Sequence, residues 1–366
     1  MTETPQHRVM TGKAWEEFCD KLKAAGEVIL RPESPATELD RAEGWRYLSR
    51  LTRIALDMML EGADPDFPEF YMASHTTAKI GADNPDNIYF NATVSGDRDY
   101  IIRGNRGTVK YLSIASRANR YAVDGTMADT GVIDVTNMEV DANGNFEIVV
   151  SQTPQNGNWL PMQPDTSMIL VRQTFLDRKA EMAANMTISR RNGPEHPNPL
   201  SAARLDKSLM AAAAFVHGTA RTFAGWSELF RKHTNQMPDI DQAFFQKAGG
   251  DPSIYYVHGY WELQPDEALV IDTQIPACEF WNFQVDNYWM ESLDYRYNQI
   301  HINPRTATYN KDGSVTIVVG HKNPGGVANF LTTDGHTSGT SLLRWVNAKS
   351  HPLPTCKVVK VAGLKK

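Results

Sequence analysis

An internal repeat constrains the fold of this chain more than any other feature, because one pattern occurs twice, about 170 residues apart. Residues 143–150 (NGNFEIVV) resemble residues 312–319 (DGSVTIVV), and an Asn-aromatic-Leu triplet follows each, at 158–160 and 329–331. Two further matches keep the same order: Tyr100–Ile102 with Leu269–Ile271, and Val171-Arg172 with Leu343-Arg344. Four matches in one order predict a duplicated structural unit.

Helical spacing of apolar residues precedes each copy of the repeat. The first main helix is expected to begin at Glu33-Ser34-Pro35, where a capping residue precedes a proline, and a shorter helix at about residues 14–25 is expected before it. The second is expected to begin at Asn198-Pro199. Their apolar faces are Trp45, Leu48, Leu51, Ala55 and Met58, and Leu205, Leu209, Ala212, Val216, Ala220 and Phe223.

Short runs of β-branched and aromatic residues follow both helical segments and predict strands. We therefore expect a mainly β chain with accessory helices, of the α+β class. It should contain two tandem antiparallel β-sandwich or jelly-roll-like modules. The expected boundaries are residues 1–65 for the first helical segment, 66–195 for the first β module, 196–250 for the second helical segment and 251–366 for the second β module. The six clearest strands are residues 100–102, 109–114, 146–150, 268–272, 279–283 and 315–319.

Composition excludes several functional classes. The 366 residues carry 37 Lys and Arg against 43 Asp and Glu, and this negative balance argues against nucleic acid as a partner. The three cysteines have no metal-binding or disulfide spacing, which favours reduced thiols and a cytoplasmic location. A signal peptide and a membrane-spanning run are not expected, and no nucleotide-binding motif occurs. Neither an organic cofactor nor a membrane partner is therefore predicted.

Several motifs resemble bacterial families of unknown function. They are Asn158–Pro161 (NWLP), Asp312–Ser314 before a Val/Ile run, residues 283–296 (FQVDNYWMESLDYR), Asn323-Pro324, Asp334–His336 and Arg344-Trp345. Together they resemble the DUF1214 family and its companion DUF1254, the latter in the first half. The likeness covers most of the chain and is clearest from Trp261 to Arg344, although Phe330 replaces the usual Trp. It implies β-sandwich modules with accessory helices and implies no reaction.

The strand over residues 281–286 and the segment after it carry the first set of candidate site residues. Alternation places Asn282, Gln284 and Asp286 opposite Trp281, Phe283 and Val285, so amides and a carboxylate share one face. Glu291 and Asp294 could divide acid and base roles if Trp289 or Tyr295 desolvated one of them, and Arg296 could bind an anion. The alternative is a charged hairpin turn with an internal Arg–Asp pair.

Three histidines, His301, His321 and His336, lie at strand edges or turns of the second module. They are candidates for a catalytic or substrate-binding role, and convergence on one metal ion is an alternative. Arg172 and Arg344 occupy equivalent places in the two copies. Their recurrence favours a structural role, although Arg344 is also a candidate for substrate binding. Aromatic residues concentrate between 255 and 297, so any pocket is expected in the second module.

These patterns favour a cofactor-independent enzyme, a lyase or hydrolase that uses acid–base chemistry on a hydroxylated or carboxylated, partly hydrophobic small molecule. The predicted catalytic residues are Glu291, Asp294, His301 and His321. The predicted substrate-binding residues are Asn282, Gln284, Trp289, Tyr295, Arg296, His336 and Arg344. One alternative is a non-catalytic protein that binds small molecules or carbohydrate. Another is a metal-dependent jelly-roll enzyme that uses the three histidines. The many strands favour a homo-oligomer.

Overall fold

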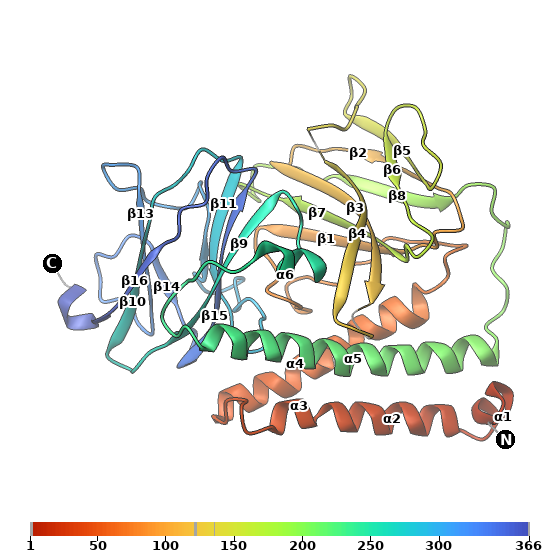
Figure 1. Ribbon diagram of the computed structural model, residues 1–366, viewed down its shortest axis with the longest axis horizontal. Helices are drawn as coiled ribbons and strands as arrows, with labels where there is room; N and C mark the ends of the chain where they lie inside the picture. Colours follow the sequence, from red (N-terminus) through yellow and green to blue (C-terminus); the bar gives the residue numbers. More distant parts are fainter. Residues whose placement is uncertain (1–2, 121–122, 135, 365–366) are drawn as a thin grey trace.

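Two β-sandwiches lie side by side, and a layer of helices covers one side of both (Figure 1). The computed structural model describes residues 3–120, 123–134 and 136–364. Within these residues, no helix combines the length and the apolar character needed to cross a membrane.

The first sandwich follows the first helical segment. One sheet has the strand order β1-β7-β3-β4 and the other β6-β5-β2-β8. Neighbouring strands are antiparallel except for β5 and β6, which are parallel. The strand bounds are β1 (Asn87–Thr93), β2 (Tyr100–Asn105), β3 (Tyr111–Arg120), β4 (Thr126–Asp134), β5 (Asn145–Ser151), β6 (Trp159–Pro161), β7 (Met168–Thr174) and β8 (Asn185–Arg190).

The second sandwich repeats this arrangement strand for strand. Its sheets have the orders β9-β15-β11-β12 and β14-β13-β10-β16, and β13 and β14 form the parallel pair. The predicted duplication and the mainly β class are thus confirmed. The strand bounds are β9 (Ile254–Glu262), β10 (Glu267–Thr273), β11 (Phe280–Val285), β12 (His301–Ile302), β13 (Val315–Gly320), β14 (Phe330–Thr332), β15 (Ser338–Val346) and β16 (Thr355–Lys360).

Two helices begin a few residues later than the sequence suggested. Helix α4 has Thr37 as its N-cap, and helix α5 has Ser201, each accepting a hydrogen bond from a backbone N–H of the first turn. Trp45, expected on the apolar stripe of α4, is 43% exposed. The bounds are α1 (Pro5–Met10), α2 (Lys13–Ala25), α3 (Glu27–Leu30), α4 (Glu38–Leu56), the π-helical turn η1 (Asp57–Glu61), α5 (Ala202–Arg231), α6 (Gln242–Lys247) and the 3₁₀ turn η2 (Val361–Leu364).

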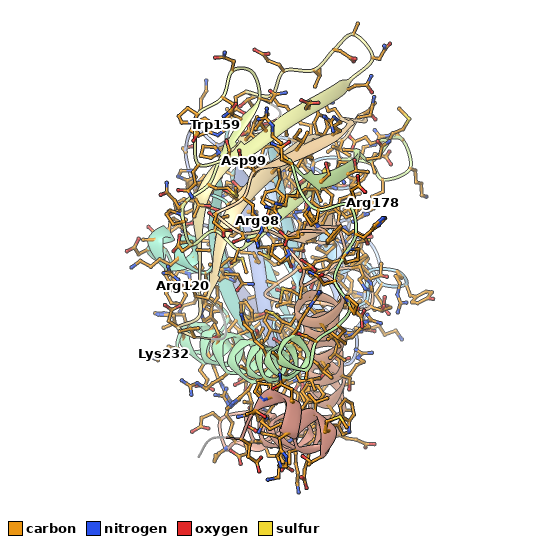
Figure 2. The ribbon with its side chains drawn as sticks, turned by 90° about the vertical axis from the view of Figure 1, so that its right-hand side faces the viewer. Arg98, Asp99, Arg120, Trp159, Arg178 and Lys232 are labelled. Carbon is orange, nitrogen blue, oxygen red and sulfur yellow. The ribbon has the colours of Figure 1, made fainter. Side chains whose placement is uncertain are left out.

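Helix α5 is the central helix of the helical layer. It runs beneath both sandwiches, with α1–α3 on its other side, and it contacts α2, α4, β9 and β15 (Figure 1). Figure 2 shows α5 end-on below the strands, with Lys232 beside it and Trp159 towards the opposite end of the first sandwich. The helices therefore cover one side of each sandwich and leave its far end uncovered.

Alternation along β7 and β15 gives each strand two buried faces. In β7, Ile169 and Val171 lie in the core of the first sandwich, whereas Met168, Leu170 and Arg172 face the helices and the other sandwich. In β15, Leu343 and Trp345 lie in the second sandwich core, and Leu342 and Arg344 face the first. Each matched arginine thus points out of its own sandwich towards the space between the two halves.

Candidate functional site

A cavity of about 160 Å³ lies between the two sandwiches and the helices. It is termed the inner cavity. The aromatic residues of the sequence predict a pocket within residues 251–366, whereas the walls of the inner cavity also come from the first sandwich and from α4 and α5. The lining includes Asn87, Tyr89, Asn91, Leu170 and Arg172 from the first half, Ile254, Tyr256, His258, Leu342 and Arg344 from the second, and Ile54, Met58, Phe215, Phe223 and Trp226 from the helices.

Equivalent Tyr–Arg pairs from the two halves face this cavity. Tyr89 of β1 is directly opposite Arg172 of β7, and Tyr256 of β9 is directly opposite Arg344 of β15. Cross-strand partners on one face of an antiparallel pair have neighbouring side chains, so each tyrosine lies beside its arginine. The duplication therefore places two copies of one polar pair at the junction of the halves.

Each arginine also holds a backbone carbonyl of the opposite half. The Nη2 atom of Arg172 donates to the Gly249 carbonyl at 2.6 Å, and that of Arg344 donates to the Ala82 carbonyl. Both acceptor residues have positive φ, +96° at Gly249 and +55° at Ala82. The contact is reciprocal, as in a twofold dimer interface, although both halves belong to one chain.

The segments that precede β1 and β9 complete this reciprocal contact. The Asn84 N–H donates to the Tyr89 hydroxyl at 2.9 Å, and the Asp251 N–H donates to the Tyr256 hydroxyl at 2.7 Å. Each segment then reaches a strand of the other half: the Asn282 amide donates to Asn84 Oδ1, and the Ser113 hydroxyl donates to Asp251 Oδ2. These contacts give the arginines the structural role that their recurrence predicted.

The two arginines differ in whether a carboxylate lies beside them. Arg172 has a carboxylate nearby, since its Nη1 atom lies 3.6 Å from Asp251 Oδ2. Arg344, which is 4% exposed, donates to neutral acceptors, namely Ala82, Asn282 and Gln284. Among the residues that the structure describes, Arg344 forms no ion pair. A buried guanidinium without a directly paired carboxylate is costly. The carboxyl group of Asp286 acts on the charge of Arg344 from a distance, with Gln284 between them.

Several buried polar atoms of the cavity lining lack a hydrogen-bond partner. Within the described residues these are Ser74 Oγ, Asn87 Oδ1, Arg172 Nη1 and His258 Nδ1. More than 90% of buried polar groups in proteins are satisfied, and four exceptions around one cavity call for an explanation. A polar ligand or ordered water in the cavity would satisfy them.

Among the described residues that line the cavity, His258 is the one histidine. Its ring stacks on Phe230 and Phe245, with centroid distances of 4.6 and 4.7 Å. Burial, together with the nearby charge of Arg344, holds the pKa of His258 well below its usual value. The imidazole is therefore neutral at pH 7 and is able to accept a proton or a hydrogen bond.

The polar face of β11 packs against the segment before β1. Asn282, Gln284 and Asp286 are fully buried, and Gln284 bridges the Asp83 carbonyl, Arg344 and Asp286. Burial raises the pKa of Asp286 to about 7. The predicted polar row is therefore a contact surface between the halves, and it positions Arg344.

Next to this row lies a buried Lys–Ser–Asp network. Lys79 donates to Ser292 and to the Leu293 carbonyl, and both oxygens of Asp83 accept hydrogen bonds from Ser292. Burial lowers the pKa of Lys79, while the charge of Asp83 opposes this shift. The network connects the segment before the first sandwich, which carries Lys79 and Asp83, to Ser292 of the second sandwich.

Three of the predicted site residues meet α4 instead of the cavity. Glu291 accepts a hydrogen bond from Arg50 Nη1 at 2.6 Å, and Trp289 donates to the Asp40 carbonyl. His336 Nδ1 lies 3.3 Å from Asp40 Oδ1, and its Nε2 lies 3.5 Å from Glu43 Oε2. These three residues thus contact α4 between Asp40 and Arg50.

The other predicted residues lie in separate places. Asp294 forms an ion pair with Arg296 within the same turn, which is the alternative the sequence left open. Tyr295 packs edge-on against His301, whose Nε2 lies 3.3 Å from Asp86. Of the predicted catalytic and substrate-binding residues, Arg344 alone lines the inner cavity.

The three histidines of the metal hypothesis do not converge. His301 contacts Asp86, His336 contacts Asp40 and Glu43, and His321 contacts the Thr333 hydroxyl and the Leu263 carbonyl. Among the described residues, no group of three or more His, Cys, Asp or Glu side chains is arranged to hold a metal ion. These histidines therefore do not form one metal site.

Two segments of the chain, residues 90–175 and 263–350, match the family described as "Protein of unknown function (DUF1214)". The chain belongs to the DUF1214 family. Each matched segment covers most strands of one sandwich, from within β1 to β7 in the first and from β10 to β15 in the second. The first half thus matches DUF1214 as well, and its expected likeness to DUF1254 stays a prediction.

Solved structures extend this family assignment. An uncharacterised protein from Burkholderia cenocepacia is 50% identical, with 98% of this chain and 99% of that chain covered at a TM-score of 0.96. The VPA0106 protein from Vibrio parahaemolyticus is 12% identical, with 87% and 98% covered at a TM-score of 0.50, and shares the fold alone. No functionally curated protein matches the chain.

Sequence reasoning missed most of the cavity lining. Tyr89, Tyr256 and His258 lie in strands whose neighbours are apolar or aromatic, and they read as ordinary strand residues. One signal was available: alternation puts Tyr256 and His258 on one face of β9, and the same rule puts Tyr89 and Asn91 on the equivalent face of β1. Aligning the two repeats would have matched these pairs.

Proposed function

We propose that this protein binds a small molecule with a carboxylate group and an apolar body in the inner cavity. The observation that carries the proposal is Arg344, a buried guanidinium that lines the cavity and has no carboxylate partner among the described residues. A ligand carboxylate would compensate its charge through strong, charge-assisted hydrogen bonds. Arg172 Nη1, which has no hydrogen-bond partner among the described residues, could donate to the same ligand.

The volume and the lining of the inner cavity indicate the size and the polarity of the rest of the ligand. An engineered protein cavity of ~150 Å³ binds benzene, so a space of this size holds an apolar body of about six carbon atoms. The helical side of the inner cavity is apolar, with Phe215, Phe223 and Trp226. The proposed ligand is therefore an acid with a body of about this size, and a strongly hydroxylated sugar would suit this lining less well.

Hexanoate is expected to bind at least ~10-fold more tightly than 1-hexanol, because a hydrogen bond to a charged group contributes about 1.5–3 kcal/mol. Isothermal titration calorimetry on the full chain measures both affinities. Arg344→Gln should remove most of the difference, whereas Arg296→Gln, an exposed arginine paired with Asp294, should leave it unchanged. Equal affinity of the wild-type protein for the acid and the alcohol would contradict the proposal without any variant.

Acid–base conversion of the bound acid is a second candidate function, in line with the lyase or hydrolase expected from the sequence. It is favoured by His258, a neutral imidazole with an unpartnered nitrogen in the cavity wall. Such a group could take the Cα proton of a 3-hydroxy acid bound at Arg344 and return it to the departing hydroxyl group, so that the C–O bond breaks, a C=C bond forms and water leaves. Glu291, Asp294, His301 and His321 do not line the inner cavity, and their catalytic role stays a prediction.

Incubation with 3-hydroxyhexanoate, followed by proton NMR, is expected to show slow loss of water from the acid. His258→Gln should stop this conversion while hexanoate still binds, because the substitution removes the proton acceptor and keeps Arg344. His217→Gln, at an exposed histidine of α5, is the matched control and should not change the rate. An acid that binds and remains unchanged would leave binding alone as the function.

Two further expectations belong to the same proposal. A cytoplasmic location is supported by the free thiols Cys19, Cys278 and Cys356, since disulfides are rare in that compartment. Assembly into a homo-oligomer stays a prediction from the sequence.

A further inference from the structure

A second, larger pocket adjoins the inner cavity. Its volume is about 400 Å³, and it is termed the outer pocket because the exposed Lys207 lies on its rim. Met58, Asn119 and Met168 line both spaces. The partition between the inner cavity and the outer pocket is therefore made of these side chains.

The sheet formed by β1 and β7 runs under both spaces without a break. Three successive cross-strand pairs form this floor: Tyr89–Arg172, Asn91–Leu170 and Thr93–Met168. The first two pairs line the inner cavity, and the third reaches the outer pocket. At ~3.3 Å per residue, Arg172 and Met168 are ~13 Å apart along the strand.

The helices pass over both spaces in the same order. On α5, Ser208 and Ala211 line the outer pocket, and Phe215 lines the inner cavity. At the end of α4, Ile54 lines the inner cavity, and Met58 of the π-helical turn η1 lines both. The β1–β7 sheet on one side and the helices on the other thus extend in the same direction, from the arginines to the outer pocket.

Weak contacts hold the partition in place. Asn119 Nδ2 lies 3.9 Å from Met58 Sδ and 4.0 Å from Met168 Sδ, and Asn91 Nδ2 lies 3.3 Å from Met168 Sδ. Thioether sulfur is a weak acceptor, and methionine side chains change rotamer easily. A π-helical turn, as at Met58, occurs often at functional sites. The side chains of Met58 and Met168 can therefore move apart at low energetic cost.

We propose that the inner cavity and the outer pocket form one binding site for a straight-chain alkyl carboxylate, with the carboxylate at the arginines and the chain passing between Met58 and Met168 into the outer pocket. This inference rests on the proposed function and names its ligand class. An extended alkyl chain advances ~1.3 Å per carbon, so ~13 Å corresponds to about ten carbons. The ligand is thus a medium-chain acid, longer than the inner cavity alone holds.

Calorimetric titration of the full chain with straight-chain acids from butyrate to dodecanoate tests the inference. Each buried methylene contributes ~0.8 kcal/mol, so the affinity should rise ~4-fold per carbon. The rise should continue to about ten carbons if the chain enters the outer pocket. It should stop near six carbons if the inner cavity is the whole site.

A pair of variants on α5 separates the two spaces. Ala211 lines the outer pocket alone, and Ala211→Leu should weaken decanoate binding at least ~10-fold while leaving butyrate and hexanoate unchanged. Ala214 is exposed on the same helix, and Ala214→Leu is the matched control that should change none of the affinities.

The outcomes distinguish this inference from the function on which it rests. An affinity that stops rising near six carbons, or an Ala211→Leu effect that is equal for all chain lengths, overturns the extended site and leaves carboxylate binding intact. If no acid of any length binds, the proposed function and the extended site are both overturned. A rise to about ten carbons that Ala211→Leu cuts short supports both.

Discussion

Replacing Asp83 by alanine is expected to lower the free energy of unfolding by about 3–5 kcal/mol, the typical effect of removing one partner of a buried charged pair. Asp83 is buried and accepts hydrogen bonds from the N–H and the hydroxyl of Ser292, at 3.0 and 2.8 Å. The same hydroxyl accepts a hydrogen bond from Lys79, which is 2% exposed. Without Asp83, the buried ammonium of Lys79 loses its compensating charge, and the Ser292 N–H loses its acceptor.

Urea denaturation followed by tryptophan fluorescence measures this loss, because Trp289 lies three residues from Ser292. Asp97→Ala provides the matched control: its side chain is 71% exposed, and the change should stay within about 0.5 kcal/mol. Adding Lys79→Met to Asp83→Ala should restore part of the stability, since it removes the uncompensated charge. A single Asp83→Ala variant as stable as the Asp97→Ala control would rule out this role of the network.

Asp83 lies in a short segment, residues 82–84, in which every residue contacts the second half of the chain. Ala82 binds Arg344, Asp83 binds Ser292, and Asn84 binds Asn282. The equivalent segment at Gly249 and Asp251 binds Arg172 and Ser113. Because each half inserts its own entry segment into the other, neither half presents a complete cavity wall alone. The site is thus a product of the duplication.

The fold could be predicted from the sequence because its signals are local and repeated. Strand β5 and strand β13 both contain runs of β-branched residues after a turn, and the occurrence of this pattern twice predicts two sandwiches. The strand order could not be derived this way, since β1 pairs with β7 across about 80 residues. Alternation predicts which residues share a face and leaves the partner strand open.

The start of α4 shows how one local contact prevents another. Ser34 before Pro35 has the residue types of a helix start, yet the helix begins at Glu38 with Thr37 as its cap. The Ser34 hydroxyl instead donates to the Val28 carbonyl and accepts from Arg31. Two capping residues lie three positions apart, and the hydroxyl of the first is already engaged by the residues that precede it.

The candidate site was harder to predict than the fold because its walls come from distant parts of the chain. The polar row of Asn282, Gln284 and Asp286 was identified as unusual, but the segment it binds lies about 200 residues earlier. Recurrence with Arg172 favours a structural role for Arg344, which is also a candidate for substrate binding. The sequence could not show that the two arginines face one cavity, because that depends on how the halves dock.

Raising the pH from 6.5 to 9.5 is expected to reduce the free energy of unfolding by about 3 kcal/mol through His336. Burial disfavours the charged imidazole, but contacts with Asp40 and Glu43 outweigh it and raise the pKa of His336 to about 9, from an ordinary value of 6.5. The charged form is therefore bound more tightly in the folded state. Its contribution is complete below pH 6.5 and is lost as the pH rises through 9, at ~1.4 kcal/mol per pKa unit.

Glu43, which contacts His336, determines how the free energy of unfolding changes at acid pH. Burial opposes the charge of Glu43, yet His336 and Asn287 lower the pKa of its carboxyl to about 2, so its contribution is complete above pH 4.5 and is lost as the pH falls through 2. The contribution of the His336–Glu43 contact is therefore greatest between pH 4.5 and 6.5. Because both shifts describe one interaction, their energies are not added.

Thermal melting of the wild-type protein and of His336→Gln between pH 6 and 10 measures the alkaline loss. Gln cannot carry the charge, so the variant should be less stable than the wild type at pH 6, and the two curves should converge above pH 9. His351→Gln is the control for an exposed histidine and should follow the wild type throughout. Asp40 and Glu43 lie in the first two turns of α4, whose far end carries Ile54 into the inner cavity. Melting curves of wild type and His336→Gln that stay parallel from pH 6 to 10 would show that this charge does not hold α4 against the second sandwich.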